Sequence, residues 1–395
     1  MRVLFCTTGG LGHLLPLRPL AAALHGRGHQ IAWVTAPDAL PRLDGQGFDL
    51  FAAGPTFEAS RRQFRTAHAE AAHLVAEQLA AFTFPRLFGD VLGPAMLAEL
   101  DLAVRRWRPD FVIHEPAALA VPLICSQHGL RHVAHGYGLR PPSEYLAAAM
   151  TFFEPHWRAR GLAVPADAGL YRHLTLDIAP PSLLAPSAPA EARIFRFNPY
   201  RPADAAPPAS PAGLGAALAK CAAPRPTIYV TFGTVFNRNP ALLAAAGAAA
   251  RLGGTVIVTA GADGELPELA ALGAHVHVHR FVDQAALLPH CDVVVSHAGA
   301  GTLLGAAAHG VPQLLLPQAA DHFRNARALS AAGAGRWIEP ERQTMDVVAS
   351  SLSGVLADGS LRAGAGRLAK EMAAMRDPAM AARGLEHWQA CAPAQ

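Results

Sequence analysis

The segment 291–322 constrains the fold more than any other part of this chain, because it reads as a strand, a glycine loop, a helix and a second strand in succession. Residues 293–295 are all valine, which is typical of a buried parallel strand. A helix is predicted from the glycine loop to about His309, where Gly310 and Pro312 end it. The apolar run after the proline predicts the second strand. This order is a unit of a doubly wound α/β sheet, with the loop at a strand's carboxyl end.

The glycine loop has the properties of a phosphate site. The first N–H groups of a helix have no intrahelical partners and carry a partial positive charge, so they attract anions. Gly299 and Gly301 allow close approach of the backbone, Thr302 adds a hydroxyl and His297 an imidazole. A tight turn without a ligand is the alternative, and a glycine-rich turn alone favours it. The histidine before the glycines and Asp321 downstream favour a nucleotide site instead.

The N-terminal end of the chain predicts a second βαβ unit. Residues 3–6 and 31–35 are apolar strands, and a helix is expected between them from His13 to about His25. A dinucleotide fingerprint needs a third glycine three residues after the second, and Leu15 occupies that position. The sequence therefore argues against a nicotinamide-dependent oxidoreductase.

A histidine and an acid at strand ends form a candidate catalytic pair. A histidine with its ordinary pKa of about 6.5 can accept a proton near neutral pH, so His13 suits a general base, although a merely solvated helix histidine is the alternative. Such a base needs an orienting carboxylate. The strand 111–113 leads into Glu115 at its carboxyl end, which ranks above His114, whereas Asp110 lies at the opposite edge.

Length and proline content predict two domains. A chain of 395 residues exceeds the usual size of one domain. Prolines and alanines crowd the segment 201–226, which predicts an extended linker between domains 1–200 and 227–375, with a terminal helix over 376–395. The strands expected are 3–6, 31–35, 49–52, 111–113, 132–134 and 193–197, then 227–232, 255–259, 276–278, 293–296, 313–316 and 336–338. Helical stretches alternate with them, so two Rossmann-like doubly wound α/β domains facing across a cleft are predicted.

Two motifs resemble those of the family 1 nucleotide-sugar glycosyltransferases, in particular the actinobacterial branch that acts on antibiotics and other natural products. Residues 12–16, GHLLP, resemble the G-H-x-x-P segment whose histidine is the general base, and Glu115 matches the position of its acidic partner. The loop 297–302 resembles the donor signature of the family. The resemblance implies a GT-B fold, with an N-terminal acceptor domain, a C-terminal donor domain and a C-terminal helix, 376–395, that crosses back to the first domain.

The same resemblance assigns binding residues. The residues that it implies for the donor nucleotide and its phosphates are Gly12, Gly233, Thr234, Phe281, Val282, His297, Gly299, Ala300, Gly301 and Thr302. Asp321 and His322 are implied to hold the donor sugar, although the family usually has glutamine in the second position, which leaves the sugar open. Acceptor binding is assigned on a different ground, because aromatic and polar groups in the N-terminal segments can line an apolar pocket. The residues chosen are Phe82, His135 and Tyr137, from a larger set of which about half are expected to face the cleft. The rest of that set is Phe84, Phe88, Tyr145, Phe152, Phe153 and Trp157.

The function predicted from this resemblance is inverting, metal-independent transfer of a sugar or deoxysugar from a dTDP- or UDP-sugar to a natural-product aglycone. The nucleotide sugar is a co-substrate, and no cofactor is expected. No Asp-x-Asp pair is present to clamp a metal, and the alternating His275, His277 and His279 are more typical of a solvated strand face. A sugar-nucleotide epimerase and a non-catalytic helper of another transferase remain as alternatives.

Composition limits the partners. The net charge of +3 gives no reason to expect nucleic acid. Five scattered cysteines without CxxC spacing predict a reduced, cytoplasmic protein, and no apolar run reaches the length of a membrane span. The expected partners are a nucleotide sugar and a small aglycone. The sequence leaves open a homodimer, the identity of the aglycone, and an O- or C-glycosidic linkage.

Overall fold

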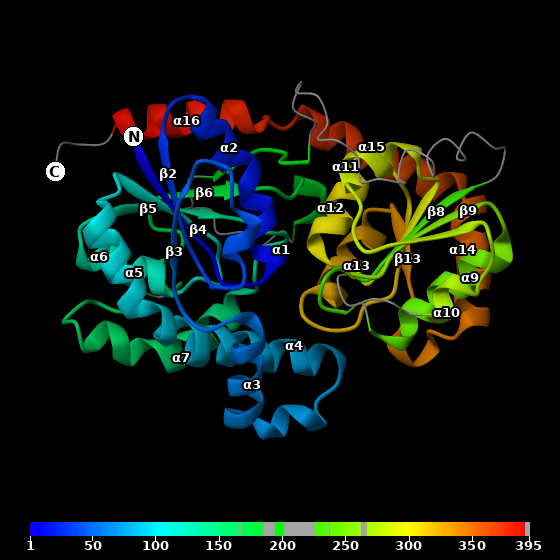
Figure 1. Ribbon diagram of the computed structural model, residues 1–395, viewed down its shortest axis with the longest axis horizontal. Coiled ribbons are helices and arrows are strands. Elements are labelled where there is room, and N and C mark those ends of the chain that lie inside the picture. The colour runs from blue at the N-terminus through cyan, green and yellow to red at the C-terminus, as the bar shows by residue number, and fades with distance from the viewer. Residues whose placement is uncertain (166, 185–193, 201–225, 237, 262–266, 392–395) are drawn as a thin grey trace. The chain divides into compact units, whose positions relative to one another are not determined.

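The computed structural model describes residues 1–165, 167–184, 194–200, 226–236, 238–261 and 267–391 (Figure 1). These residues form two compact units: the first comprises 1–179, 194–199 and 376–391, and the second comprises 180–184, 200 and 226–375. The expected linker 201–226 lies outside the described residues except for Pro226.

A parallel sheet forms the centre of the first unit. Its seven described strands run in the order β3-β2-β1-β4-β5-β6-β7. Their bounds are β1 Arg2–Cys6, β2 Gln30–Thr35, β3 Asp49–Ala52, β4 Phe111–His114, β5 Arg131–His135, β6 Leu174–Asp177 and β7 Ile194–Arg196. Sequence reasoning missed β6, because its Leu-Thr-Leu-Asp pattern lacks the apolar run that marks the other buried strands.

Helices cover this sheet. They are α1 Leu11–Leu14, α2 Arg18–Gly26, α3 Phe57–Ala67, α4 Ala76–Phe84, a π-helix Pro85–Leu92, α5 Gly93–Trp107, α6 Ala120–Gln127, α7 Ser143–Arg158 and α16 Pro378–Ala390, with 3-10 turns at Leu15–Leu17, Leu40–Arg42 and Ala69–His73. The predicted single helix from His13 to His25 is wrong in two respects. It begins earlier, at Leu11, and a 3-10 turn containing Pro16 divides it, because proline has no N–H for a regular helical bond.

The second unit repeats the architecture with six described parallel strands in the order β10-β9-β8-β11-β12-β13. The strands are β8 Thr227–Thr231, β9 Thr255–Thr259, β10 Val276–His279, β11 Val293–Ser296, β12 Gln313–Leu315 and β13 Gly335–Trp337. The helices are α9 Pro240–Leu252, α10 Pro267–Ala270, α11 Gln284–Leu287, α12 Ala300–Ala308, α13 His322–Ala331, α14 Met345–Ala357 and α15 Gly359–Ala374, with 3-10 turns at Pro181–Leu183, Leu288–His290 and Pro340–Arg342. Every one of these strands overlaps a strand expected from the sequence.

The C-terminal helix α16 packs on the first unit (Figure 1). Glu386 accepts hydrogen bonds from the Arg27 guanidinium at 2.7 and 2.8 Å. The guanidinium of Arg131 lies 3.9 Å from the ring centroid of Trp388, which also meets Phe111 edge-on. Charge pairs and ring contacts therefore hold the chain's last described helix against the end of α2 and against β4 and β5.

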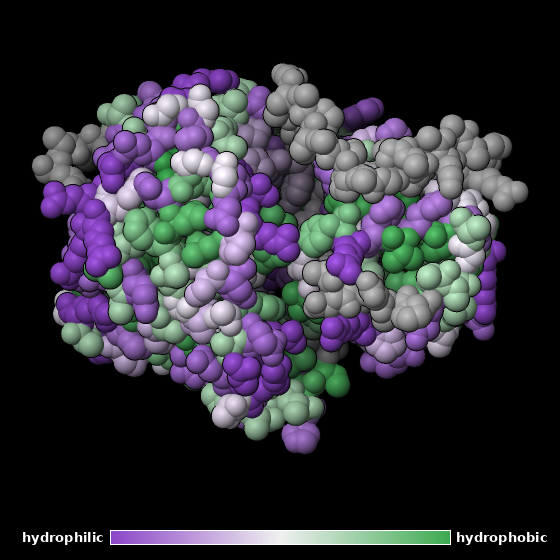
Figure 2. All heavy atoms as spheres, in the orientation of Figure 1, coloured by the Kyte–Doolittle hydropathy of each residue, from purple (hydrophilic) through white to green (hydrophobic). Residues whose placement is uncertain are grey.

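The surface carries hydrophilic and hydrophobic side chains interspersed over the visible face of each unit (Figure 2). None of the described helices combines the length and the apolar character needed to cross a membrane. Among the described residues the cysteines are free thiols, at Cys6, Cys125, Cys291 and Cys391.

Candidate active site

The first unit brings His13 and Glu115 together. His13 lies in the first turn of α1, and Glu115 follows the last residue of β4. The His13 Nδ1 atom lies 3.3 Å from Glu115 Oε2 and 3.3 Å from Thr8 Oγ1. Because Nδ1 faces these oxygen atoms, the neutral tautomer with its hydrogen on Nδ1 is favoured. The other nitrogen, Nε2, is then free to accept a proton.

Glu115 is buried but kept ionised. Burial opposes its charge, yet the neighbouring His13 and the donors around the carboxylate outweigh burial and hold the pKa of Glu115 below its usual value. The donors are the N–H and O–H of Thr8, at 3.1 and 2.9 Å from Oε1, and the N–H of Ala117, at 2.5 Å from Oε2. The carboxylate is thus fixed in place and negatively charged beside the imidazole.

Two aromatic rings flank His13. The ring of Tyr137 stacks on the imidazole with centroids 4.2 Å apart, and the ring of Phe88 lies at 5.6 Å. The side chain of His13 keeps 20% of its surface exposed, whereas Glu115 has none. The imidazole is therefore partly accessible to solvent beside two aromatic rings.

The other residues predicted for acceptor binding contact different groups. Phe82 lies under the guanidinium of Arg86, 3.6 Å from its ring centroid. His135 is fully buried against Phe197, and burial lowers its pKa to about 4. Of the three residues assigned to the acceptor, the structure places Tyr137 alone against His13. The wider set divides as well: Phe153 and Trp157 are core residues, and Phe84 packs on Phe88 and Tyr145.

In the second unit the glycine loop joins β11 to α12 with an unusual backbone. Ala298 has φ of 68°, which is uncommon for a residue with a side chain. Its N–H donates to Ser296 Oγ at 3.2 Å, and its carbonyl accepts from Asn325 Nδ2 at 2.9 Å. Gly299 then forms the N-cap without a side-chain bond, so α12 begins at Ala300 with N–H groups available to an anion.

His297 is a neutral ring at this loop. It is 8% exposed and packs against Phe232, Phe236 and His322, with the His322 ring centroid 4.6 Å away. Burial lowers the pKa of His297 to about 3, so it carries no charge at neutral pH. Gly233, with φ of 66°, approaches the ring so closely that a Cβ there would lie 2.9 Å from it.

The predicted sugar residues lie at the start of α13. The Nδ1 atom of His322 accepts from the N–H groups of Gln318 and Ala319 at 3.3 and 3.2 Å, so the ring hydrogen is on Nε2. Burial lowers the pKa of His322 to about 3. Asp321 is half-buried and accepts from Asn325 Nδ2 at 2.8 Å. Because the loop uses Nδ1 of His322 as an acceptor, the remaining polar group of this ring is the Nε2–H donor.

The remaining donor residues occupy several elements. Thr302 is buried in α12, and its hydroxyl accepts from Gln284 Nε2 at 3.2 Å. Phe281 is 43% exposed beside the buried Val282, in the segment between β10 and α11. Thr234 is exposed in the turn after β8, and Gly301 lies in the first turn of α12. Gly12, in contrast, belongs to α1 of the first unit, where it is exposed.

Sequence reasoning missed the residues that position these groups. They are Thr8, Ser296, Gln318 and Asn325. Thr8 and Ser296 carry a recognisable signal, because each is a hydroxyl residue at the carboxyl end of a predicted strand. Across the described part of the chain, no group of three or more His, Cys, Asp or Glu side chains is placed to hold a metal ion.

Comparison with known proteins matches both halves of the chain. Residues 22–207 match the N-terminal domain, and residues 243–387 the C-terminal domain, of erythromycin biosynthesis protein CIII-like proteins. L-demethylnoviosyl transferase of Streptomyces niveus is 31% identical, over 98% of this chain and 97% of its own. Elloramycin glycosyltransferase ElmGT of Streptomyces olivaceus is 32% identical, over 96% of this chain and 95% of its own.

A solved structure supports the same relationship. The glycosyltransferase SsfS6 of Streptomyces sp. SF2575, complexed with thymidine diphosphate, superposes with a TM-score of 0.75 at 26% identity, covering 98% of this chain and 99% of that one. The expected two-domain α/β class and GT-B fold are thereby confirmed.

Proposed function

The chain belongs to the family of actinobacterial natural-product glycosyltransferases, and we propose that it moves a sugar from a thymidine diphosphate sugar to a hydroxyl of an aglycone, with inversion and without a metal. The related proteins are named for sugar transfer in antibiotic biosynthesis, and SsfS6 was solved with thymidine diphosphate. The observation that carries the proposal is the His13–Glu115 pair, a partly exposed imidazole held by a buried carboxylate.

His13 acts as the general base in this proposal. Its Nε2 takes the proton of the acceptor hydroxyl while the oxygen attacks the anomeric carbon of the donor. Glu115 accepts the Nδ1 hydrogen bond throughout and stabilises the imidazolium that forms. The bond between the anomeric carbon and the diphosphate oxygen breaks, and its electron pair leaves with the diphosphate. A single displacement of this kind inverts the anomeric centre.

The leaving diphosphate is assigned to the start of α12. The N–H groups of Ala300, Gly301 and Thr302 lie in the first helical turn, where they have no partner within the helix, and they stabilise the charge that develops on the leaving oxygen. His297 contributes hydrogen bonding without charge, since it is neutral. The helix terminus thus takes the part that a divalent cation takes in metal-dependent transferases.

The donor sugar is assigned to α13. Asp321 can accept hydrogen bonds from sugar hydroxyls, and His322 donates one through Nε2–H. Glutamine at position 322 would offer both a donor and an acceptor. We therefore infer that the donor sugar presents one acceptor oxygen where other members of the family read a hydroxyl in both directions.

Two measurements test the proposal. The purified protein is incubated with thymidine and uridine diphosphate sugars and a panel of aromatic and macrolide acceptors, and products are identified by mass spectrometry. His13→Ala should abolish transfer while calorimetry shows unchanged binding of thymidine diphosphate. His25→Ala, at the exposed end of α2, is the matched control. A glycoside formed at the wild-type rate by His13→Ala contradicts the assignment of the base.

Metal independence has its own test. Excess chelator should leave the transfer rate unchanged. If transfer stops and only magnesium or manganese restores it, the assignment of the leaving group to the helix terminus is wrong.

A further inference from the structure

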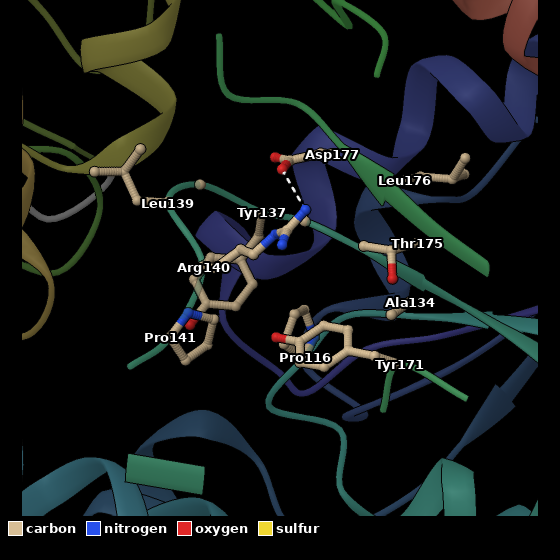
Figure 3. Close-up of a pocket in the computed structure, with 12 residues that line it drawn as sticks. Pro116, Ala134, Tyr137, Leu139, Arg140, Pro141, Tyr171, Thr175, Leu176 and Asp177 are labelled. Carbon is tan, nitrogen blue, oxygen red and sulfur yellow. Dashed lines mark hydrogen bonds and ion pairs between the residues drawn. The ribbon is translucent and has the colours of Figure 1, made fainter. Parts of the chain in front are cut away.

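A small cavity lies in the first unit between the ends of β5 and β6 (Figure 3). We call it the β5–β6 cavity; its walls include Pro116, Tyr137, Arg140, Tyr171, Thr175 and Asp177. Its volume of about 10 Å³ admits one group of the size of a water molecule. The cavity can therefore receive a single substituent of a larger molecule and not the molecule itself.

Two buried hydrogen-bond donors at this cavity have no partner among the described residues. They are the Oγ1 hydroxyl of Thr175, a residue only 3% exposed, and the Nε–H of Arg140. Buried polar groups are almost always hydrogen-bonded, so such groups indicate an occupant other than the described residues. A guanidinium nitrogen can only donate, and a hydroxyl can donate. The occupant they fit is an oxygen that accepts hydrogen bonds.

The cavity's charge balance indicates that this oxygen is uncharged. Arg140 Nη2 donates to Asp177 Oδ2 at 2.9 Å, and Asp177 is 1% exposed (Figure 3). The other carboxylate oxygen of Asp177 accepts from the Ala179 N–H at 3.2 Å. The aspartate thus neutralises the guanidinium within a buried pair. A second carboxylate would meet the negative charge of Asp177, whereas a carbonyl oxygen would not.

The cavity adjoins the proposed base. Tyr137 forms part of its wall and stacks on His13 at 4.2 Å, and Pro116 directly follows Glu115. Tyr137 therefore borders both the imidazole of His13 and the β5–β6 cavity.

From these observations we propose that the β5–β6 cavity is an acceptor subsite that binds an uncharged carbonyl oxygen of the aglycone through Thr175 and Arg140. The proposal rests on the function proposed above, because it concerns the acceptor of that reaction. It narrows the substrate class to hydroxylated aglycones that carry a ketone, lactone or amide carbonyl.

Binding of three phenols tests the subsite without requiring transfer. They are para-hydroxyacetophenone, which has a neutral carbonyl, para-ethylphenol, which has none, and para-hydroxybenzoate, which is anionic. Calorimetry on the full chain with thymidine diphosphate present should give roughly tenfold tighter binding of the ketone than of the ethyl compound, with the benzoate weakest. Equal affinities, or the benzoate as the tightest ligand, would overturn the proposal.

Variants of Thr175 test whether the preference for the ketone over the ethyl compound arises in the β5–β6 cavity. Thr175→Val should bring the ratio of the two neutral affinities close to one, and Thr175→Ser should retain the preference. Thr151→Val, which changes an exposed residue of α7, is the matched control. The melting temperature should not fall in Thr175→Val, because the change removes an unpaired buried hydroxyl.

A lower melting temperature with an unchanged affinity ratio would mean that the hydroxyl serves a structural water only, which overturns the proposal. Failure of the subsite is distinguishable from failure of the proposed function. If no donor and acceptor pair yields a glycoside but the ketone preference depends on Thr175, the transfer proposal fails and the subsite stands. If a glycoside forms but the preference for the ketone is absent, the subsite proposal fails and the transfer proposal stands.

Discussion

Replacing Glu115 by glutamine removes the charge that orients His13 and keeps the shape of the side chain. The two charges would lie 3.3 Å apart when the imidazole is protonated in the transition state. At this separation, with an effective dielectric constant of about 20, a pair of unit charges is worth about 5 kcal/mol. Because His13 is 20% exposed, water replaces part of that stabilisation. We expect a loss of about 4 kcal/mol, or roughly a thousandfold in kcat.

The amide also disturbs the hydrogen bonds around it. The carboxylate of Glu115 accepts from the N–H groups of Thr8 and Ala117, one at each oxygen. In Glu115→Gln the amide NH₂ must face one of these donors, which leaves buried N–H groups unpaired and costs about 1–3 kcal/mol of stability. The variant should therefore melt at a lower temperature than the wild type, and its kinetics must be measured well below that temperature.

The assay compares kcat and KM for transfer with the affinity for thymidine diphosphate. The expected result is a loss in kcat with unchanged nucleotide affinity, since the nucleotide is assigned to the second unit. Glu99→Gln, an exposed residue of α5, is the matched control and should behave as the wild type. A folded Glu115→Gln variant that keeps a tenth or more of the wild-type kcat would refute the assignment of Glu115 as the partner of the base.

Three further predictions concern the second unit. Gly299→Ala should weaken the binding of thymidine diphosphate at least tenfold, as measured by calorimetry, because the added Cβ would lie 2.4 Å from His297 Nε2. Gly366→Ala is the control and should leave this affinity unchanged, because a Cβ there meets nothing within 4 Å. His322→Gln should shift the ratio of kcat/KM between donors that differ at one hydroxyl by roughly five- to a hundredfold, and an unchanged ratio would remove this residue from sugar recognition. Stability should fall as the pH drops from 7 toward 4, because the unfolded chain protonates its histidines near pH 6.5 while folded His297 and His322 have pKa values of about 3. Each contributes up to about 2 kcal/mol of this loss at pH 5, and urea titrations at pH 7.5 and pH 5 with equal midpoints would contradict it.

The sequence was most informative where the structure depends on neighbours along the chain. β11, the glycine loop and α12 follow from a valine run, two glycines and a glycine–proline stop, all within one segment. The pairing of His13 with Glu115 could also be predicted from the sequence. Adjacent parallel strands place their carboxyl ends at one edge of the sheet, and β1 does pair with β4.

Contacts between segments that are distant in the chain could not be predicted from the sequence in the same way. His135 and Tyr137 are two residues apart, yet one is buried against Phe197 and the other stacks on His13. Nothing in a single sequence tells which side of the chain faces the core just beyond a strand's end. The roles of Asn325 and of the His322 Nδ1 atom likewise depend on loop carbonyl and N–H positions that no residue pattern encodes.

The two units keep their buried titratable residues in opposite charge states. In the first, hydrogen bonds and His13 keep the buried Glu115 ionised; in the second, burial keeps His297 and His322 neutral. Neutral imidazoles cannot supply positive charge to a diphosphate, so the attraction assigned to α12 must come from backbone N–H groups, whose partial charge does not titrate. Nucleotide affinity should then vary little with pH between about 5 and 8 apart from the phosphate's own ionisation. The pH dependence of transfer should instead come from the first unit, where the proton is taken.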